Sequence, residues 1–312
     1  MELSVAQAIH AGYSSPTTQD GSYACKYKNI HFSAVVDGHG AGGPVYPEAL
    51  IECLNMLVPE QLSRTTLMSD EAHSDLLKII IEELHKVDVP AFAGSTVTLC
   101  MINLDTWKLY AANLGDSPLM VFLPNTEEYP MAYLSQNWRQ YQTSHHMILR
   151  TNDHDANNEE EIARIRHIGG IIIKGSQGEG RLQGCTLTTA GLGDHHVDKR
   201  SEKAVVRRDP ELYLMDLSGL NDFTIILGSD GMLEYPHNGT LRLKASDIMM
   251  HHISDYLSAV TTMDIDNCPE EILRMQIEKI VEVTIDKWNG DWRKIIDNRD
   301  IRMIRRRKMI ES

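Results

Sequence analysis

Short apolar runs, bounded by Gly, Pro, Asp and Asn, alternate along the chain with segments whose apolar residues recur at helical spacing. The apolar runs predict strands. The expected strands cover residues 3–10, 23–27, 30–36, 95–104, 108–113, 119–123 and 171–173, a buried run that ends before Asp230, and residues 301–304. Residues 124–144 are polar and aromatic without a clear period, so we expect surface loops there.

Helical spacing predicts helices at residues 45–57, 70–87, 159–168, 247–260 and 269–288. Ser69 or Asp70 is the expected N-cap of the second helix, and Asn157 or Asn158 is the expected N-cap of the third. No internal repeat or low-complexity linker interrupts the pattern. We therefore expect a single domain over residues 1–312, with a basic C-terminal tail at residues 305–312.

Composition narrows the class of protein. Apolar residues make up 42% of the 312 residues, which is enough for a full core, and the net charge of −14 argues against general nucleic-acid affinity. The five cysteines are far apart and never in C-x-x-C spacing, which favours a reduced intracellular protein over a disulfide scaffold or a zinc module. No apolar run approaches the length of a membrane span, so we expect none.

Candidate chemistry concentrates in residues 31–43, where an apolar strand leads into Asp37, a series of glycines and His39. An ordinary turn, a nucleotide cradle and a site for metal and proton-transfer chemistry all fit this stretch. Residues 38–43 satisfy G-x-G-x-x-G, but the dinucleotide fingerprint also needs a second strand that ends in an acid about 20 residues later. Residues 59–70 are polar and show no strand pattern, which disfavours the nucleotide interpretation.

Several aspartates share one context, because each lies at a predicted strand end or turn, and most adjoin a glycine. They are Asp20, Asp37, Asp116, Asp194, Asp230 and Asp297. Strands of one sheet can bring such carboxylates to one edge, where they repel each other unless a cation neutralises them. Oxygen ligands without thiolates favour magnesium or manganese over zinc. A two-metal site of this kind activates water and holds an oxyanion, which indicates phosphoryl hydrolysis.

The sequence VVDGHGAGG at residues 35–43 resembles the DGHGG motif of the metal-dependent protein phosphatases, the type 2C serine/threonine family. Other blocks follow in the family's order. They are Gly94–Thr96 (GST), Ala112–Ser117 (A-N-x-G-D-S), Asp153–His154 with Glu161, Arg164, Ile165, Gly169 and Gly170, then Leu192–Asp194, Ile225–Gly231 and Asp297–Asn298. The resemblance extends over residues 4–304.

The resemblance implies an α+β fold, a four-layer αββα sandwich of two mostly antiparallel β-sheets flanked by helices. It implies two Mg²⁺ or Mn²⁺ ions, with Asp37 bridging both and the Gly38 carbonyl on one of them. The other positions that match metal ligands are Asp20, directly or through a water, together with Asp230 and Asp297. A third metal would lie at Asp116 and Glu234, where glutamate replaces the more usual aspartate.

The implied reaction is hydrolysis of phosphoserine and phosphothreonine on proteins. A water activated by the metal pair attacks phosphorus, and His39 is the general acid that protonates the leaving oxygen. The expected partner is a phosphoprotein substrate bound by a monomer, with no nucleic acid or membrane partner; no substrate-binding residue is assigned. We expect an intracellular, cytoplasmic protein, or a nuclear one if the basic residues 305–308 act as an import signal.

The chain departs from the family pattern where the substrate phosphate is held. Ser15 occupies the position at which the family often has a phosphate-binding arginine, and Pro118 and Ala190 replace two further arginines. Gln19 replaces the usual glutamate before Asp20. Two functions therefore stay open. One is an active phosphatase; the alternative is a catalytically weak pseudophosphatase that binds a phosphoprotein or partner as a regulatory module.

Overall fold

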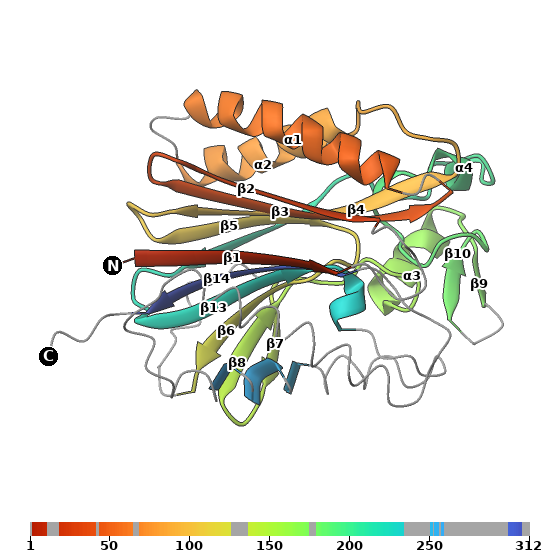
Figure 1. The fold of residues 1–312 in the computed structure, drawn as a ribbon. Helices are drawn as coiled ribbons and strands as arrows, with labels where there is room; N and C mark the ends of the chain where they lie inside the picture. Colours follow the sequence, from red (N-terminus) through yellow and green to blue (C-terminus); the bar gives the residue numbers. More distant parts are fainter. Residues whose placement is uncertain are drawn as a thin grey trace, which may run out of the picture.

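Two β-sheets are stacked face to face, and two helices cover the outer face of one of them (Figure 1). The computed structural model describes residues 2–10, 19–41, 44–64, 69–125, 137–174, 179–233 and 299–307, and all residues from 250 to 258 except 252 and 256. Neighbouring strands in both sheets are antiparallel. The described residues thus have the expected α+β fold.

The first sheet carries the residues of the candidate site on its central and edge strands. Its strands, in spatial order, are β12 (Glu211–Asp216), β5 (Lys108–Leu114), β4 (Ala93–Asn103), β3 (Ile30–Gly40) and β2 (Asp20–Tyr27). The short β11 (Leu192–Gly193) also pairs with β4. Helices α1 (Val45–Ser63) and α2 (Asp70–Leu84) cover its outer face.

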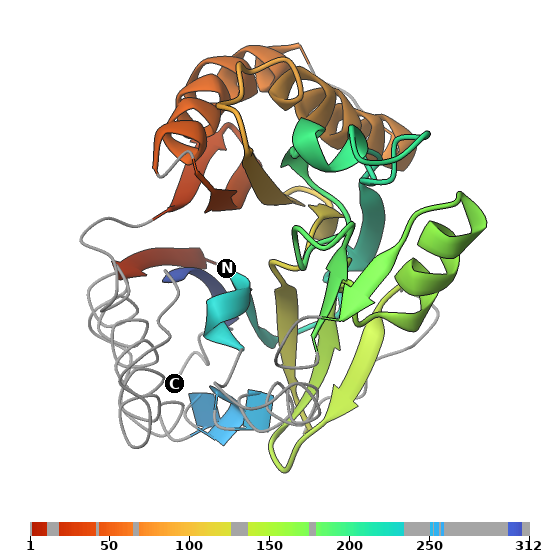
Figure 2. The same ribbon diagram turned by 90° about the vertical axis from the view of Figure 1, so that its right-hand side faces the viewer.

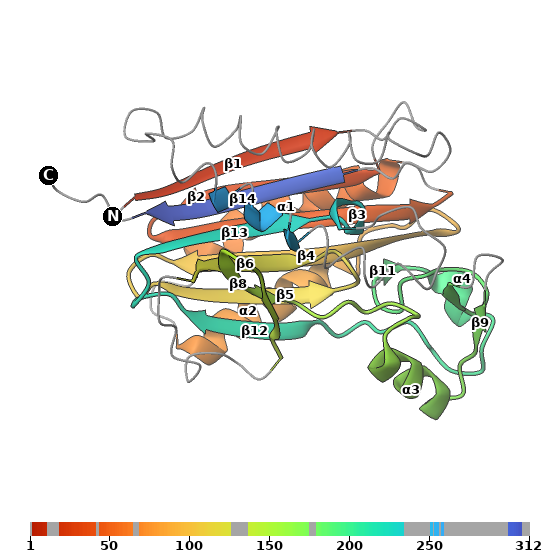
Figure 3. The ribbon, with the colours of Figure 1, turned by 90° about the horizontal axis from the view of Figure 1, so that it is seen from below.

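The second sheet joins the two ends of the chain (Figure 3). Its strands, in spatial order, are β1 (Glu2–His10), β14 (Arg299–Arg307), β13 (Asp222–Gly228), β6 (Leu119–Pro124), β8 (His146–Arg150) and β7 (Arg139–Gln142). The helical residue Ser254 lies against this sheet, because its Oγ is 2.8 Å from Nδ1 of His146 and 2.6 Å from Oγ1 of Thr143. Helical residues thus flank both sheets.

The apolar run of β3 is continuous because both faces of the strand are buried. Phe32, Ala34 and Val36 pack in the cluster between the first sheet and the helices, whereas Val35 packs in the cluster between the two sheets. The helices complete the first cluster with residues at helical spacing. On α1 these are Tyr46, Leu50, Leu54, Val58 and Leu62.

Smaller elements gather at the end of the sandwich where β3 ends, the right-hand end in Figure 1. They are α3 (Glu159–His167), β9 (Ile172–Lys174), β10 (Gly180–Leu182) and α4 (His195–Asp198). The 3₁₀ helix η2 (Asp230–Met232) follows β13 and lies at this same end, which Figure 2 shows facing the viewer. This end of the two sheets therefore carries the candidate site.

Most of the expected elements are confirmed within a few residues. The N-caps are also confirmed: the Ser69 side chain accepts a hydrogen bond from the Ala72 N–H at 3.3 Å, and Asn158 accepts one from the Glu160 N–H at 3.0 Å. The helix expected at residues 269–288 and half of the one expected at residues 247–260 lie outside the described residues.

Three expectations about element bounds were wrong. Strand β3 continues through Gly40, because β4 pairs with it as far as Ala93 and supplies the hydrogen bonds of the ladder. Helix α1 continues past Pro59, because Val58 and Leu62 remain buried on either side of it. Strand β14 reaches Arg307, so residues 305–307 are paired in the sheet and are not part of a tail.

The segment that was expected to form surface loops contains a strand. Within residues 124–144, β7 pairs with β8, and Trp138 beside it is buried against Tyr213 with ring centroids 4.9 Å apart. Strand β12 at residues 211–216 was not predicted from the sequence. None of the helices in the described part of the chain has the length and apolar content that a membrane crossing requires.

We predict that Leu54→Ala lowers the free energy of unfolding by about 2–5 kcal/mol, because it leaves a cavity between α1 and the first sheet. Met56 is 68% exposed on the same helix, so Met56→Ala is the matched control and should change stability by less than about 0.5 kcal/mol. Urea denaturation measures both. Equal losses in the two variants would contradict the assigned helix face.

Candidate functional site

Asp20 and Asp37 lie directly opposite each other at the end of the β2–β3 pair. Asp20 is buried and Asp37 is half-buried, so water screens their charges only in part. Like charges in opposite positions on neighbouring strands are destabilising. Two carboxylates placed in this way fit a hard divalent cation, which binds oxygen ligands and offsets the repulsion.

Gly38 permits a close approach of three backbone segments beside Asp37. Its N–H donates to the Gln19 carbonyl oxygen at 2.9 Å. A Cβ at this position would lie 2.2 Å from Cγ of Pro47, near the start of α1, and 2.6 Å from the Gln19 oxygen. The start of α1 and the residue before Asp20 can therefore approach β3 only because residue 38 is glycine.

His39 belongs to β3 and not to a turn, because it pairs with Gly94 of β4. Its Nε2 is 2.8 Å from Oδ2 of Asp194, which is fully buried, while 29% of the His39 side chain is exposed. The imidazole is thus held by a buried carboxylate while part of the side chain is accessible from solvent. This arrangement suits a group that exchanges a proton with a bound molecule.

Asp116 lies in the turn between β5 and β6. This turn packs on Thr96 of β4, the residue that pairs with Asp37. Thr96 pairs with Asp37, and its Oγ1 is 2.6 Å from Oγ of Ser117. A Cβ at Gly115, whose φ is +127°, would lie 2.5 Å from Cβ of Thr96. Asp116 is buried at this turn.

Asp230 is the first residue of η2, directly after β13, and it is half-buried. Strand β13 contacts β3, and η2 contacts β14, which places Asp230 at the same end of the sandwich as Asp37. Asp297, Glu234 and Ser15 lie outside the described residues. Within the residues that are described, no three His, Cys, Asp or Glu side chains converge closely enough to hold a metal ion.

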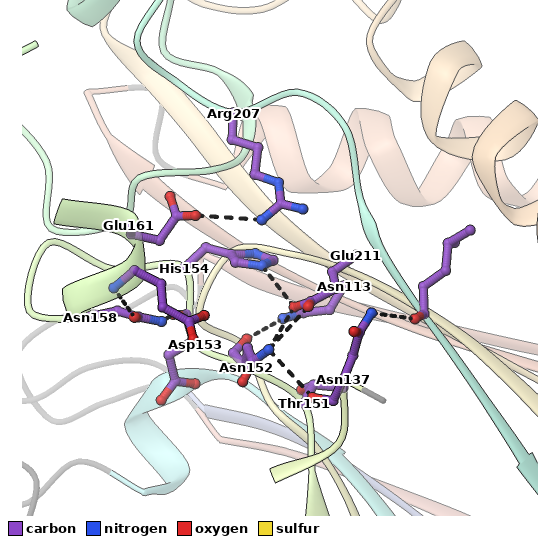
Figure 4. A network of polar contacts seen from close by, with 12 residues as sticks. Asn113, Asn137, Thr151, Asn152, Asp153, His154, Asn158, Glu161, Arg207 and Glu211 are labelled. Atoms are coloured by element: carbon purple, nitrogen blue, oxygen red, sulfur yellow. Dashed lines mark hydrogen bonds and ion pairs between the residues drawn. The ribbon is translucent and has the colours of Figure 1, made fainter. Parts of the chain in front are cut away.

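His154, Asn152 and Glu211 form a polar network (Figure 4), and His154 connects this network to the turn that carries Asp116. Nδ1 of His154 accepts a hydrogen bond from the Gly115 N–H at 3.2 Å, so the proton of a neutral imidazole is on Nε2, which donates to Oε2 of Glu211 at 3.2 Å. Glu211 also accepts hydrogen bonds from Asn152 at 3.0 Å and from the Tyr213 hydroxyl at 2.6 Å. This network connects β12 to the turn.

Burial alone would raise the pKa of Glu211, but the donors on His154, Tyr213 and Asn152 outweigh it and lower the pKa from 4.5 to about 2. Glu161 on α3 shows the same balance: burial raises its pKa, while hydrogen bonds from Arg164 and Thr189 bring it below the ordinary value. Both carboxylates are thus ionised parts of the framework around the site.

The sequence did not predict the roles of Glu211, Arg208 or Asp194. Asp194 was grouped with the aspartates expected at one sheet edge and with the Leu192–Asp194 block, but not with His39, which is 155 positions away in the chain. Arg208 donates to the carbonyl oxygens of Gly191 and Gly193, which lie in the segment that leads to Asp194. No local pattern signals such a long-range contact.

Comparison with known proteins gives a family match over much of the chain. Residues 17–241 match the family model described as Protein phosphatase 2C. A Paramecium tetraurelia protein named Probable protein phosphatase 2C 6 is 24% identical over 238 residues, which is 70% of each chain. A rice protein named Probable protein phosphatase 2C 32 is 33% identical over 88 residues, and the match spans 28% of this chain and only 21% of the rice protein's length.

Solved structures share the fold. A phosphatase from Toxoplasma gondii superimposes with a TM-score of 0.65 at 15% identity, over 99% of this chain and 96% of that one. A sex-determining protein from C. elegans gives a TM-score of 0.64 at 18% identity, over 99% of this chain and 66% of that one.

We predict that Glu211→Gln lowers the free energy of unfolding by roughly 2–3 kcal/mol near pH 7, because the folded state favours the ionised carboxylate. The pKa of Glu211 is lower in the folded state, so its contribution is complete above 4.5 and is lost as the pH falls toward 2. The difference between wild type and variant should therefore shrink as the pH falls. Urea denaturation over this range measures it.

The exposed Glu202 provides the control, since Glu202→Gln should have little effect at any pH. A stability difference for Glu211→Gln that stays constant as the pH falls would contradict the assigned network.

Proposed function

The chain belongs to the protein phosphatase 2C family, and we propose that it hydrolyses phosphoserine and phosphothreonine on proteins. The observation that supports this most is the placement of Asp20 opposite Asp37, two positions before an accessible His39. We also propose one catalytic domain over residues 1–312, because β1 and β14 pair the two ends of the chain in one sheet.

We propose that two Mg²⁺ or Mn²⁺ ions are held by Asp20, Asp37, the Gly38 carbonyl, Asp230 and Asp297, and a third by Asp116 and Glu234. The metal dependence of the family and the opposed carboxylates of β2 and β3 support this assignment. When bound, divalent cations in such a site supply water activation at neutral pH and neutralise phosphate charge.

His39 gives its proton to the serine or threonine oxygen as the P–O bond breaks. An alkoxide is a poor leaving group, so this proton transfer matters more for a phosphoserine or phosphothreonine than for an activated aryl phosphate. The position of His39 on a paired strand favours this role, since the ladder with Gly94 fixes its backbone. Nε2 of the ring contacts the buried Asp194, and the exposed part of the His39 side chain is accessible to a substrate.

We predict that Mn²⁺ supports hydrolysis of 4-nitrophenyl phosphate and that EDTA abolishes it. Asp37→Asn should lower the rate at least about 100-fold, since the metal-assisted water is worth several kcal/mol. The exposed Asp88 offers the control Asp88→Asn, which should retain full activity. Activity that persists in EDTA or in Asp37→Asn would refute the metal mechanism.

The same assay distinguishes the two functions that the sequence left open, an active phosphatase and a catalytically weak regulatory module. Tight Mn²⁺ binding by the wild type without any hydrolysis would favour the regulatory, catalytically weak alternative.

We predict that His39→Ala lowers the rate on a phosphothreonine peptide by about 10² to 10⁴-fold, the usual range for a general acid. The loss on 4-nitrophenyl phosphate should be much smaller, because its leaving group needs no proton. Steady-state kinetics on the two substrates measures the ratio, and equal losses would count against the proton-donor role.

A further inference from the structure

The buried carboxylate of Asp194 reaches the His39 ring across a position that carries no side chain. Strand β4 lies between β3 and β11, and its Gly94 pairs with His39 on one side and with Gly193 on the other. A Cβ at Gly94 would lie 2.3 Å from Oδ2 of Asp194 and 2.4 Å from Nε2 of His39. The 2.8 Å contact between these two atoms therefore requires glycine in the middle strand.

The backbone around Asp194 holds the carboxylate in one orientation. Asp194 has a φ of +54°, in the left-handed region that few side chains other than Asn and Asp adopt. Its N–H donates to the Ala93 carbonyl oxygen at 2.9 Å. The Arg208 guanidinium donates to the carbonyl oxygens of Gly191, at 2.8 Å, and of Gly193. The loop that carries Asp194 is thus fixed on both sides of β11.

Asp194 differs from the carboxylates that stabilise the framework. Glu161 is also buried, and its oxygens accept hydrogen bonds from Arg164 and Thr189. Asp194 is fully buried, yet within the described residues its side chain has one hydrogen-bond partner, His39, and its Oδ1 has none. A buried carboxylate with so few donors costs stability, so a structural role does not account for it.

We propose that Asp194 is a positioning residue that holds Nε2 of His39 inward and leaves Nδ1 to face the leaving oxygen of the substrate. An ionised carboxylate only accepts hydrogen bonds, so the proton on Nε2 is directed toward Asp194. In the reaction, the Nδ1 proton of His39 moves to the leaving oxygen as the P–O bond breaks. The Nε2 proton stays in place, and Asp194 is not protonated. This inference rests on the proposed function of His39.

The kinetic test uses Asp194→Asn, because asparagine fits the left-handed backbone and has nearly the same shape. With Mn²⁺, kcat on a phosphothreonine peptide should fall by up to about 100-fold, the lower end of a general acid's contribution. The KM for the peptide and the kcat on 4-nitrophenyl phosphate should change little. Equal losses on the two substrates would overturn the proposal.

A double variant tests whether Asp194 acts through His39. Adding Asp194→Asn to His39→Ala should cause no further loss on the peptide, since the residue to be positioned is already absent. A further loss as large as in the wild-type background would overturn the proposal.

Stability separates positioning from a structural role. Asp194→Asn should keep or raise the melting temperature, because it removes a buried carboxylate that has too few hydrogen-bond donors. Glu161→Gln is the matched control. It should lower the melting temperature, because it replaces a carboxylate that accepts several stabilising hydrogen bonds. A loss of stability in Asp194→Asn as large as in Glu161→Gln would show that Asp194 serves the framework.

A measurement without metal or substrate keeps the inference separate from the proposed function. In the metal-free wild type at mildly alkaline pH, ¹⁵N NMR of the His39 ring should show the proton on Nε2, and Asp194→Asn should shift the tautomer toward Nδ1. A wild-type ring with the proton on Nδ1 would overturn the positioning role. A wild type inactive with Mn²⁺ would instead count against the proposed phosphatase function.

Discussion

The opposition of Asp20 and Asp37 across the β2–β3 pair is the constraint on which the rest of the site depends. Strand β3 is paired on both sides, with β2 and with β4, so its Asp37 cannot move away from Asp20 without breaking ladder hydrogen bonds. Two carboxylates held in this way repel each other, and a divalent cation with oxygen ligands offsets such a repulsion. A binding site therefore explains an opposed carboxylate pair at the end of a well-packed sandwich better than packing does.

Close backbone approach, made possible by glycines, gives this end of the molecule its shape. Gly38 lets the start of α1 approach β3, Gly94 lets Asp194 reach His39, and Gly115 lets the turn that carries Asp116 lie on Thr96. The functional side chains therefore lie on paired strands or on turns tied to them, and their positions vary less than those of side chains on long loops. Glu211 and His154 extend this rigidity, because they connect β12 to the Gly115 turn through buried hydrogen bonds.

Local patterns in the sequence correctly predicted the features that depend on residues close together in the chain, namely strands and helix caps. Strand periodicity and the Ser69 and Asn158 caps were correct, because an alternating apolar face or a capping side chain needs only a few neighbours. The strand was expected to end at residue 36, but pairing with β4 extends it through Gly40 and overrides the weak strand preference of the glycines. The contact between His39 and Asp194 could not be predicted, since it depends on two strands meeting on opposite sides of Gly94. Topology, which no single segment encodes, determines that part of the site.

The stability of Asp37→Asn with and without Mn²⁺ tests whether the opposed carboxylates of Asp20 and Asp37 hold a divalent cation. Without metal, the substitution removes one of two opposed charges and should raise the free energy of unfolding by up to about 1 kcal/mol. With saturating Mn²⁺, the wild type should gain about 3 kcal/mol or more at 100 times its dissociation constant, and the variant should gain little, so their order of stability reverses. An unchanged order, with Mn²⁺ stabilising both proteins equally or neither, would contradict a divalent-cation site at Asp37.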